Sequence, residues 1–173
     1  MDDVKPAPEF LKTGKAMNAT STITRRLAVV SARVNAVLRY GDPAHYAEAR
    51  RLREMMQKLI PSYNNLSAED ILVYEGRGIL YNRCSGLHTD SRDPQKGYAI
   101  LTAFGNFKGG YVRIPHLGLR IRLEPGDAIA LRGRVMPHQI EQWDEGQRIS
   151  IPHFTHSSVW KCFGFKSVFT YLE

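Results

Sequence analysis

The sequence predicts a mainly β fold, a double-stranded β-helix (jelly-roll) flanked by two N-terminal amphipathic helices. The chain has 173 residues, 43% of them hydrophobic and 24% charged, which is enough apolar material for one globular core. Apolar residues recur with a helical period between residues 21 and 60. After about residue 70 they form short runs separated by turn residues, a pattern typical of jelly rolls.

The first 20 residues are predicted to form a flexible arm, because they are rich in Pro, Lys, Ala and Thr and show no apolar period. Residues 21–173 are expected to form a single domain. No apolar run approaches the roughly 20 residues that cross a bilayer, and the first ten residues lack the order of a signal peptide. We therefore expect a soluble, intracellular protein without a membrane partner.

The first helix is predicted from Ser21 to Tyr40, and Gly41 ends it. Its apolar stripe has spacings of four, three, four and three and consists of Ile23, Leu27, Val30, Val34 and Val37. A second helix is predicted with Asp42 as its N-cap, and it runs to about residue 60. Its apolar face consists of Tyr46, Ala49, Leu52, Met56 and Leu59. Pro61 is expected to end it.

The opposite faces of these helices are basic. We interpret them as solvated surface in preference to a DNA-contacting face. The residues concerned are Arg25, Arg26, Arg33, Arg39, Arg50, Arg51, Arg53 and Lys58.

Eight strands are predicted after residue 70. In order they are ILVYE, GILYNRC, YAILTAF, YVRIP, LRIRLE, AIALRG, HQIEQW and ISIPHFT. The turns between them include Asn-Phe-Lys-Gly-Gly, Glu-Pro-Gly-Asp and Asp-Glu-Gly-Gln. In LRIRLE, the alternation predicts that Leu119, Ile121 and Leu123 face the core and that the charged residues between them face water.

Three side chains in this region predict a metal site. His88 and Asp90 lie two residues apart on an extended segment and so point to the same side, and His138 follows much later in the chain. Two imidazoles and one carboxylate on one face of a metal form the facial triad of non-haem Fe(II) oxygenases, which leaves positions open for O₂ and a 2-oxo acid. We therefore predict an iron site with these three ligands.

Arg148 and Ser150 are predicted to bind the co-substrate. They lie two residues apart on one strand, so the guanidinium can grip a carboxylate through two hydrogen bonds while the hydroxyl adds a third donor. A dicarboxylic 2-oxo acid fits this pair. Among the remaining histidines, His116 is expected at the surface, and His45 in an exposed helix cap.

The stretch from Tyr81 to Trp160 resembles the oxygenase domain of the TET/JBP family of 2-oxoglutarate/Fe(II)-dependent dioxygenases, and most of all its fungal, transposon-associated branch. The matching pieces are HTD, FGNFKGG, IPHLGLRI, EPGD, RGRVMPH, GQRIS and FTHSSVW. HTD and Arg-x-Ser occur in many 2-oxoglutarate oxygenases, whereas the combination of the other pieces is more specific.

The resemblance implies Fe(II) and 2-oxoglutarate as cofactors, O₂ as co-substrate, and oxidation of the methyl group of a 5-methylpyrimidine (5-methylcytosine or thymine) in nucleic acid. By matching positions, His88, Asp90 and His138 bind iron, and Arg148 binds the distal carboxylate of 2-oxoglutarate. Asn82 is a candidate for a hydrogen bond to the proximal carboxylate.

A net charge of +7 and a pI near 9.6 favour a polyanionic partner, and we expect DNA in preference to RNA and the nucleus in preference to the cytoplasm. A base inside a duplex must be flipped out to reach such a site. Candidate substrate-binding residues are His153, His156, Arg92 and Lys96. Two alternatives remain: an oxygenase of another substrate, by AlkB-like N-demethylation or protein side-chain hydroxylation, and a non-catalytic nucleic-acid-binding jelly-roll.

Overall fold

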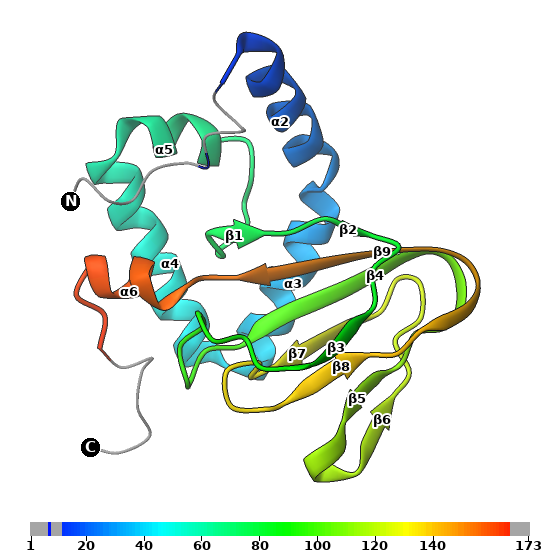
Figure 1. Cartoon of the computed structure of the whole chain (residues 1–173). Helices are drawn as coiled ribbons and strands as arrows, with labels where there is room; N and C mark the ends of the chain where they lie inside the picture. The colour runs from blue at the N-terminus through cyan, green and yellow to red at the C-terminus, as the bar shows by residue number, and fades with distance from the viewer. Residues whose placement is uncertain (1–6, 8–11, 167–173) are drawn as a thin grey trace. The chain divides into compact units, whose positions relative to one another are not determined.

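The computed structural model describes residue 7 and residues 12–166 (Figure 1). The described residues group into two compact units. One holds the chain up to Tyr74 together with Val159–Phe165, and the other holds Glu75–Ser158 and Lys166. The prediction of one domain over residues 21–173 stays a prediction, because two compact units can belong to one cooperatively folding domain.

The first unit is built mainly from helices. The described helices of the chain are α2 (Gly14–Arg26), α3 (Ala28–Gly41), α4 (Pro43–Leu59), α5 (Pro61–Ser67) and α6 (Ser157–Cys162). The buried apolar side chains of α3 and α4 are Val34, Leu38, Ala49, Leu52 and Met56. The helical period predicted four of them but not Leu38, and two members of the predicted apolar faces, Ile23 and Leu59, are 47% and 45% exposed. Within the described part of the chain, no helix is both long enough and apolar enough to cross a membrane.

The first predicted helix is in fact two helices. The break falls at Leu27, whose N–H is shared between the carbonyl oxygens of Ile23 (3.0 Å) and Thr24 (3.2 Å), a tightening typical of a helix end. α2 also begins earlier than expected, at Gly14, after the Thr13 hydroxyl caps it. Residues 14–20 are therefore helical and not an arm. Most of the preceding arm lies outside the described residues.

The start of α4 is confirmed, but the environment of its first histidine differs from expectation. Asp42 caps the helix by accepting a hydrogen bond from the His45 N–H (2.9 Å). His45 itself is buried and not exposed, with its ring centroid 6.1 Å from that of Tyr74 and 5.8 Å from that of Trp160. Pro61 ends α4 as predicted and also begins α5, because proline suits the first turn of a helix.

The predicted strand ILVYE (71–75) is not a strand. Its main-chain groups bond to side chains: the Val73 N–H donates to Asn35 Oδ1 (3.0 Å), and the Leu72 carbonyl accepts from Arg53 (2.7 Å). Arg53 also donates to the Ser67 carbonyl (2.6 Å), so it is a structural residue and not solvated surface. This segment has the composition of a strand because most of it is buried, but it does not pair with a neighbouring strand.

The second unit consists of two antiparallel sheets (Figure 1), which confirms the double-stranded β-helix. The major sheet has the order β1-β9-β4-β7, with β2 also paired to β9, and the minor sheet has the order β3-β8-β5-β6. The strands are β1 (Gly76–Arg77), β2 (Leu80–Tyr81), β3 (Ser85–His88), β4 (Ala99–Gly109), β5 (Val112–Ile114), β6 (Leu119–Ile121), β7 (Ala128–Leu131), β8 (His138–Ile140) and β9 (Trp143–Phe154). A short 3₁₀ turn, η1 (Pro115–Leu117), joins β5 to β6.

The segments Asn-Phe-Lys-Gly-Gly and Asp-Glu-Gly-Gln, which were predicted to be turns, instead belong largely to two paired strands. Asn106 pairs with Gln147 and Phe107 pairs with Gly146, so that β4 and β9 run side by side from Ile100↔His153 to Gly109↔Trp143. Gly146 has a φ of +78°, and a side chain there would overlap the Asn106 carbonyl. This glycine therefore permits a close approach of two strands, whereas its sequence context predicts a turn.

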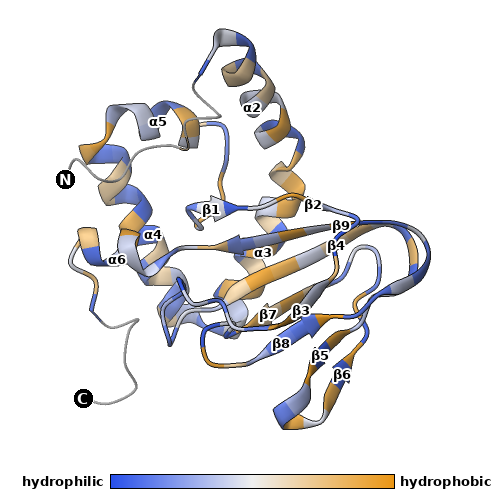
Figure 2. Ribbon diagram, in the orientation of Figure 1, coloured by the Kyte–Doolittle hydropathy of each residue, from blue (hydrophilic) through white to orange (hydrophobic). Residues whose placement is uncertain are grey.

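Apolar residues of both sheets meet between them. The buried cluster comprises Ala103, Phe107, Val112, Ile114, Leu123, Leu131 and Ile140. Figure 2 shows hydrophobic residues along these strands. The predicted core face of LRIRLE is correct for Leu123 but wrong for Leu119, which is 45% exposed because it lies where β6 leaves the η1 turn.

Candidate metal centre and adjoining cavity

His88, Asp90 and His138 come together as one cluster, here called the metal group. Their ligand atoms all lie within 4.8 Å of one another. His88 ends β3 and His138 begins β8, and the two are directly paired across the minor sheet. Asp90 follows in the next loop, with one carboxylate oxygen 3.6 Å from His88 Nε2 and the other 3.8 Å from His138 Nε2. The geometry can hold one metal ion between two imidazoles and a carboxylate.

Hydrogen bonds orient both imidazoles toward this shared point. Nδ1 of His88 lies 2.8 Å from the Gly86 carbonyl oxygen, and Nδ1 of His138 lies 2.9 Å from the Met136 carbonyl oxygen. Each ring donates its Nδ1–H to a carbonyl, which leaves the Nε2 lone pair for a metal. Such second hydrogen bonds are typical of metal-binding histidines.

The main chain of Gly133 holds Asp90. The Asp90 N–H donates to the Gly133 carbonyl (2.9 Å), and a side chain at position 133 would overlap Oδ2 of Asp90. The absence of a side chain at Gly133 therefore makes room for the carboxylate.

The metal group is open on one side. The side chains of His88, Asp90 and His138 are 41%, 33% and 9% exposed, respectively. Three protein ligands with an accessible side fit a metal that must also bind small molecules, and this nitrogen and oxygen donor set suits Fe(II).

Arg148 is a buried cation inside the β unit. It is 1% exposed, and among the described residues none of its three guanidinium nitrogens has a hydrogen-bond partner. The guanidinium carbon lies 5.4 Å from the Phe107 ring centroid and 5.9 Å from that of Trp143. Burial lowers the pKa of Arg148. A buried guanidinium without an anion is costly, so its surroundings fit a carboxylate ligand.

The other two predicted co-substrate residues lie beside Arg148. Ser150 is buried two residues further along β9, on the same face. Asn82 follows β2 and is bonded to the main chain of Arg148: its N–H donates to the Arg148 carbonyl (2.8 Å), and its Oδ1 accepts from the Arg148 N–H (2.9 Å). The predicted contact between Asn82 and the proximal carboxylate stays a prediction.

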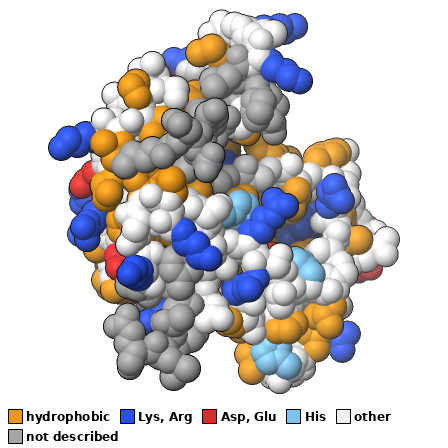
Figure 3. All heavy atoms as spheres, turned by 60° about the vertical axis from the view of Figure 1, so that its left-hand side comes forward, with side chains coloured by type: hydrophobic (Ala, Val, Ile, Leu, Met, Phe, Trp, Pro, Cys, Tyr) orange, Lys and Arg blue, Asp and Glu red, His pale blue; other side chains and the backbone are white. Residues whose placement is uncertain are grey.

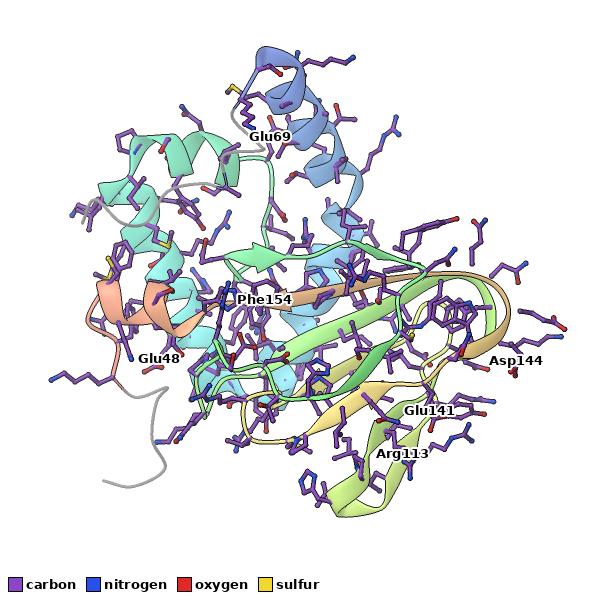
Figure 4. The ribbon with its side chains drawn as sticks, in the orientation of Figure 1. Glu48, Glu69, Arg113, Glu141, Asp144 and Phe154 are labelled. Carbon is purple, nitrogen blue, oxygen red and sulfur yellow. The ribbon has the colours of Figure 1, made fainter. Side chains whose placement is uncertain are left out.

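A cavity of about 300 Å³ adjoins the metal group. Asp90 belongs to both, because it lines the cavity as well as the metal group. The other lining residues are Thr89, Ser91, Arg92, Asp93, Ala99, Pro152, Phe154 and His156. Figure 4 labels Phe154, whose ring centroid lies 4.6 Å from that of His156. The cavity thus offers an aromatic ring, apolar walls and a few polar groups.

Asp93 and His156 form a polar pair in this cavity. Nδ1 of His156 lies 3.2 Å from Oδ1 of Asp93, whose side chain is buried. Burial raises the pKa of Asp93 to about 6, the nearby charge of Asp90 adds to the rise, and His156 and Arg134 oppose it. A carboxyl with a raised pKa beside an imidazole in a cavity is typical of a functional site.

The predicted substrate-binding residues divide into two groups. His156 and Arg92 line the cavity. His153 is fully buried in β9, with Nδ1 3.0 Å from the Ile100 carbonyl oxygen, and Lys96 is half-buried; neither belongs to the cavity lining. Asp93 was not among the predicted site residues, although Arg92 and Lys96 on either side of it were. Figure 3 shows histidine side chains at the surface with Lys and Arg side chains around them.

Residues 5–157 match the Tet_JBP family, described as the oxygenase domain of the 2OGFeDO superfamily. This match covers most of the chain. A comparison with curated proteins found no significant match.

One solved structure shows the same fold. The structure of NgTET1 in complex with 5mC DNA superposes with a TM-score of 0.60 at 18% identity, and the match covers 87% of this chain and 55% of NgTET1. The chain therefore spans about half the length of that protein. The collagen prolyl hydroxylase vCPH of Paramecium Bursaria Chlorella virus-1, in its 2OG complex, matches more distantly, with a TM-score of 0.35 at 14% identity over 60% of this chain and 73% of vCPH.

Proposed function

The chain belongs to the Tet/JBP family of 2-oxoglutarate- and Fe(II)-dependent dioxygenases, and from this membership we propose that it oxidises the methyl group of a 5-methylpyrimidine in nucleic acid. The observation that carries the proposal is the shared position of Asp90. This residue belongs to the metal group and also lines the cavity, so a methyl group held in the cavity would lie near the metal.

In this proposal the metal group binds Fe(II), and Arg148 with Ser150 binds the distal carboxylate of 2-oxoglutarate. Bound together, iron and 2-oxoglutarate supply the oxidation of a C–H bond to an alcohol by O₂, with release of succinate and CO₂. The Nδ1–H groups of both histidines donate to main-chain carbonyls, so Nε2 is the ring nitrogen that can bind the metal. The buried guanidinium of Arg148 gains the anionic partner that the described residues do not provide.

The cavity residues provide what recognition of a single base requires. The Phe154 ring can stack on the base, and Ala99 and Pro152 exclude water around it. The Asp93 carboxylate is an acceptor suited to the exocyclic amino group of cytosine, whereas thymine presents an acceptor at the same place. We therefore propose 5-methylcytosine as the preferred base, with His156 holding the carboxylate in place. The cavity volume is at the small end of the ~300–1,000 Å³ of small-molecule sites.

A base in a duplex must leave its stack to enter the cavity before it can be oxidised. Arg92 lies in the cavity lining and is exposed, so it can contact the phosphates that flank a flipped nucleotide. The net charge of +7 favours such contacts. DNA is the proposed polymer, since NgTET1 was solved with 5mC DNA. With DNA as the substrate, the proposed location of the protein is the nucleus.

The proposal is tested by oxidation of short DNA oligonucleotides. Full-length protein is loaded anaerobically with Fe(II) and 2-oxoglutarate and then exposed to air with oligonucleotides that contain 5-methylcytosine or thymine. Mass spectrometry measures succinate and oxidised bases. We expect oxidised 5-methylcytosine together with succinate, and loss of both products in His88→Ala. The matched control is His116→Ala, because His116 is an exposed histidine of η1 outside the site.

Two results would contradict the proposal. Succinate without an oxidised base would indicate another substrate, such as an N-methylated base or a protein side chain. Neither product, from protein that binds Fe(II) and 2-oxoglutarate, would indicate a non-catalytic module.

A further inference from the structure

Asn82 has an unusual backbone conformation at the point where the chain leaves the major sheet. Among the described residues it is the one non-glycine residue with a positive φ, at +49°. Residues other than glycine seldom adopt this left-handed conformation, and asparagine tolerates it better than most. Such conformations persist where the surrounding structure holds them, and they cluster at functional sites.

Two hydrogen bonds join Asn82 to the main chain of Arg148. β2 pairs with β9 at Leu80↔Ser150 and Tyr81↔Ile149, and the Asn82 N–H continues this ladder to the Arg148 carbonyl (2.8 Å). The left-handed turn at Asn82 ends the regular strand. The side-chain Oδ1 then accepts from the Arg148 N–H (2.9 Å), in the role that a strand carbonyl would otherwise fill.

The other side of this segment of β9 is equally constrained. Gly105 of β4 pairs with Arg148, and a side chain at Gly105 would overlap the Gln147 carbonyl. Gly110 approaches the Arg148 side chain itself, where an added Cβ would lie 3.2 Å from Nε. The main chain of Arg148 is thus held between Asn82 and β4.

We propose that Asn82 is a positioning residue, which fixes the main chain of Arg148 and thereby aims its guanidinium at the distal carboxylate of 2-oxoglutarate. The proposal rests on the role proposed above for Arg148. The guanidinium has no hydrogen-bond partner among the described residues, so its direction depends on its packing and on the main chain that carries it. The same turn leads the chain to β3, where His88 lies six residues after Asn82.

Three substitutions separate the two properties of Asn82. Asn82→Asp keeps a side-chain acceptor and tolerates the left-handed conformation, Asn82→Gly keeps the conformation but removes the acceptor, and Asn82→Ala impairs both. Asn18→Gly is a matched control, because Asn18 is exposed in α2. A positioning role therefore predicts that wild type and Asn82→Asp bind 2-oxoglutarate equally well. Asn82→Gly should bind it more weakly, and Asn82→Ala most weakly.

The experiment measures 2-oxoglutarate binding to full-length, Fe(II)-loaded protein by anaerobic calorimetry. For Asn82→Gly we expect a Kd, and a KM for 2-oxoglutarate, raised on the order of 5-fold, the effect of one main-chain hydrogen bond. Fe(II) affinity should stay within about twofold of wild type, as should kcat at saturating 2-oxoglutarate. Thermal unfolding of each variant checks that it is folded. If Asn82→Ala does not fold, Asn82→Gly still tests the inference.

Two outcomes would overturn the inference. If Asn82→Gly binds 2-oxoglutarate like wild type, the acceptor has no positioning role. If Asn82→Asp, which keeps the acceptor, binds 2-oxoglutarate as weakly as Asn82→Gly, the acceptor at this position does not set the affinity. Arg148→Gln tests the premise separately. If Arg148→Gln binds 2-oxoglutarate like wild type, the proposed role of Arg148 is refuted. If Arg148→Gln binds it more weakly but Asn82→Gly binds it like wild type, only the inference about Asn82 is refuted.

Discussion

His88 and His138 stand opposite each other on the antiparallel strands β3 and β8, and their ring centroids lie 4.4 Å apart. The pairing of these strands therefore builds the metal group from residues far apart in the sequence. Asp90 completes it from the following loop, where its N–H is bonded to the Gly133 carbonyl (2.9 Å). The position of the three side chains therefore depends on strand register and on one loop contact.

The loop contact predicts the effect of Gly133→Ala. A methyl group at position 133 would overlap Oδ2 of Asp90, and the backbone of Gly133 lies outside the left-handed region, so the effect is steric alone. We expect Fe(II) affinity to fall about 10- to 100-fold, as for other losses of ligand support. Calorimetry with Fe(II) under anaerobic conditions measures it. Gly41→Ala is the control, since a methyl group there meets open space; equal affinities in the two variants would contradict the prediction.

The polar pair of the cavity predicts base preference. Asp93→Asn replaces an acceptor by a side chain that can also donate, so it should favour thymine, which presents an acceptor where cytosine presents an amino group. We expect the ratio of oxidised 5-methylcytosine to oxidised thymine to fall about tenfold, within the ~1–3 kcal/mol of discrimination of a good base contact. Competition between the two oligonucleotides at pH 8 measures the ratio by mass spectrometry. An unchanged ratio with reduced turnover of both bases would show that Asp93 does not contact the base.

The proximity of His88 and Asp90 was predictable from sequence because their signal is local, whereas His138 lies far along the chain. His88 and Asp90 have the two-residue spacing that places strand side chains on one side, and imidazole with carboxylate is a recognisable ligand set. Asp93 had no such signal. Asp93 is a candidate functional residue because it is buried and contacts His156. The two residues lie 63 positions apart in the sequence, and only the fold brings them together.

The fold was predictable where periodicity and burial agree. α4 carries its buried residues at helical spacing and begins at an aspartate cap, so its start was predicted correctly. α2 buries none of its residues, so hydrophobic periodicity could not reveal its start. Gly146 was misread because glycine serves turns and close strand approaches alike, and only the partner strand distinguishes them.

Arg92 should contribute to the salt dependence of DNA binding. It is exposed in the cavity lining, so a contact with one phosphate would release about one counterion. We expect Arg92→Gln to reduce the slope of log affinity against log salt by about 1. Fluorescence anisotropy with a labelled oligonucleotide measures it. Arg122→Gln is the control, because Arg122 is exposed and ion-paired with Glu124 (3.3 Å); the same slope in both variants would place Arg92 outside the interface.

Arg148 should reduce stability in the absence of its ligand and increase it when the ligand is bound. Without 2-oxoglutarate, Arg148→Met replaces a buried cation that has no hydrogen-bond partner among the described residues by an apolar chain of similar length. Because desolvation of an unpaired charge is costly, the free energy of unfolding should be unchanged or higher in this variant. Added 2-oxoglutarate at 100 times its Kd should stabilise metal-loaded wild type by about 2.7 kcal/mol, and Arg148→Met by much less at the same concentration. Thermal unfolding with and without 2-oxoglutarate measures both effects. If Arg148→Met were strongly destabilised without 2-oxoglutarate, the guanidinium would be part of the folding core, and its burial would no longer indicate a missing anion.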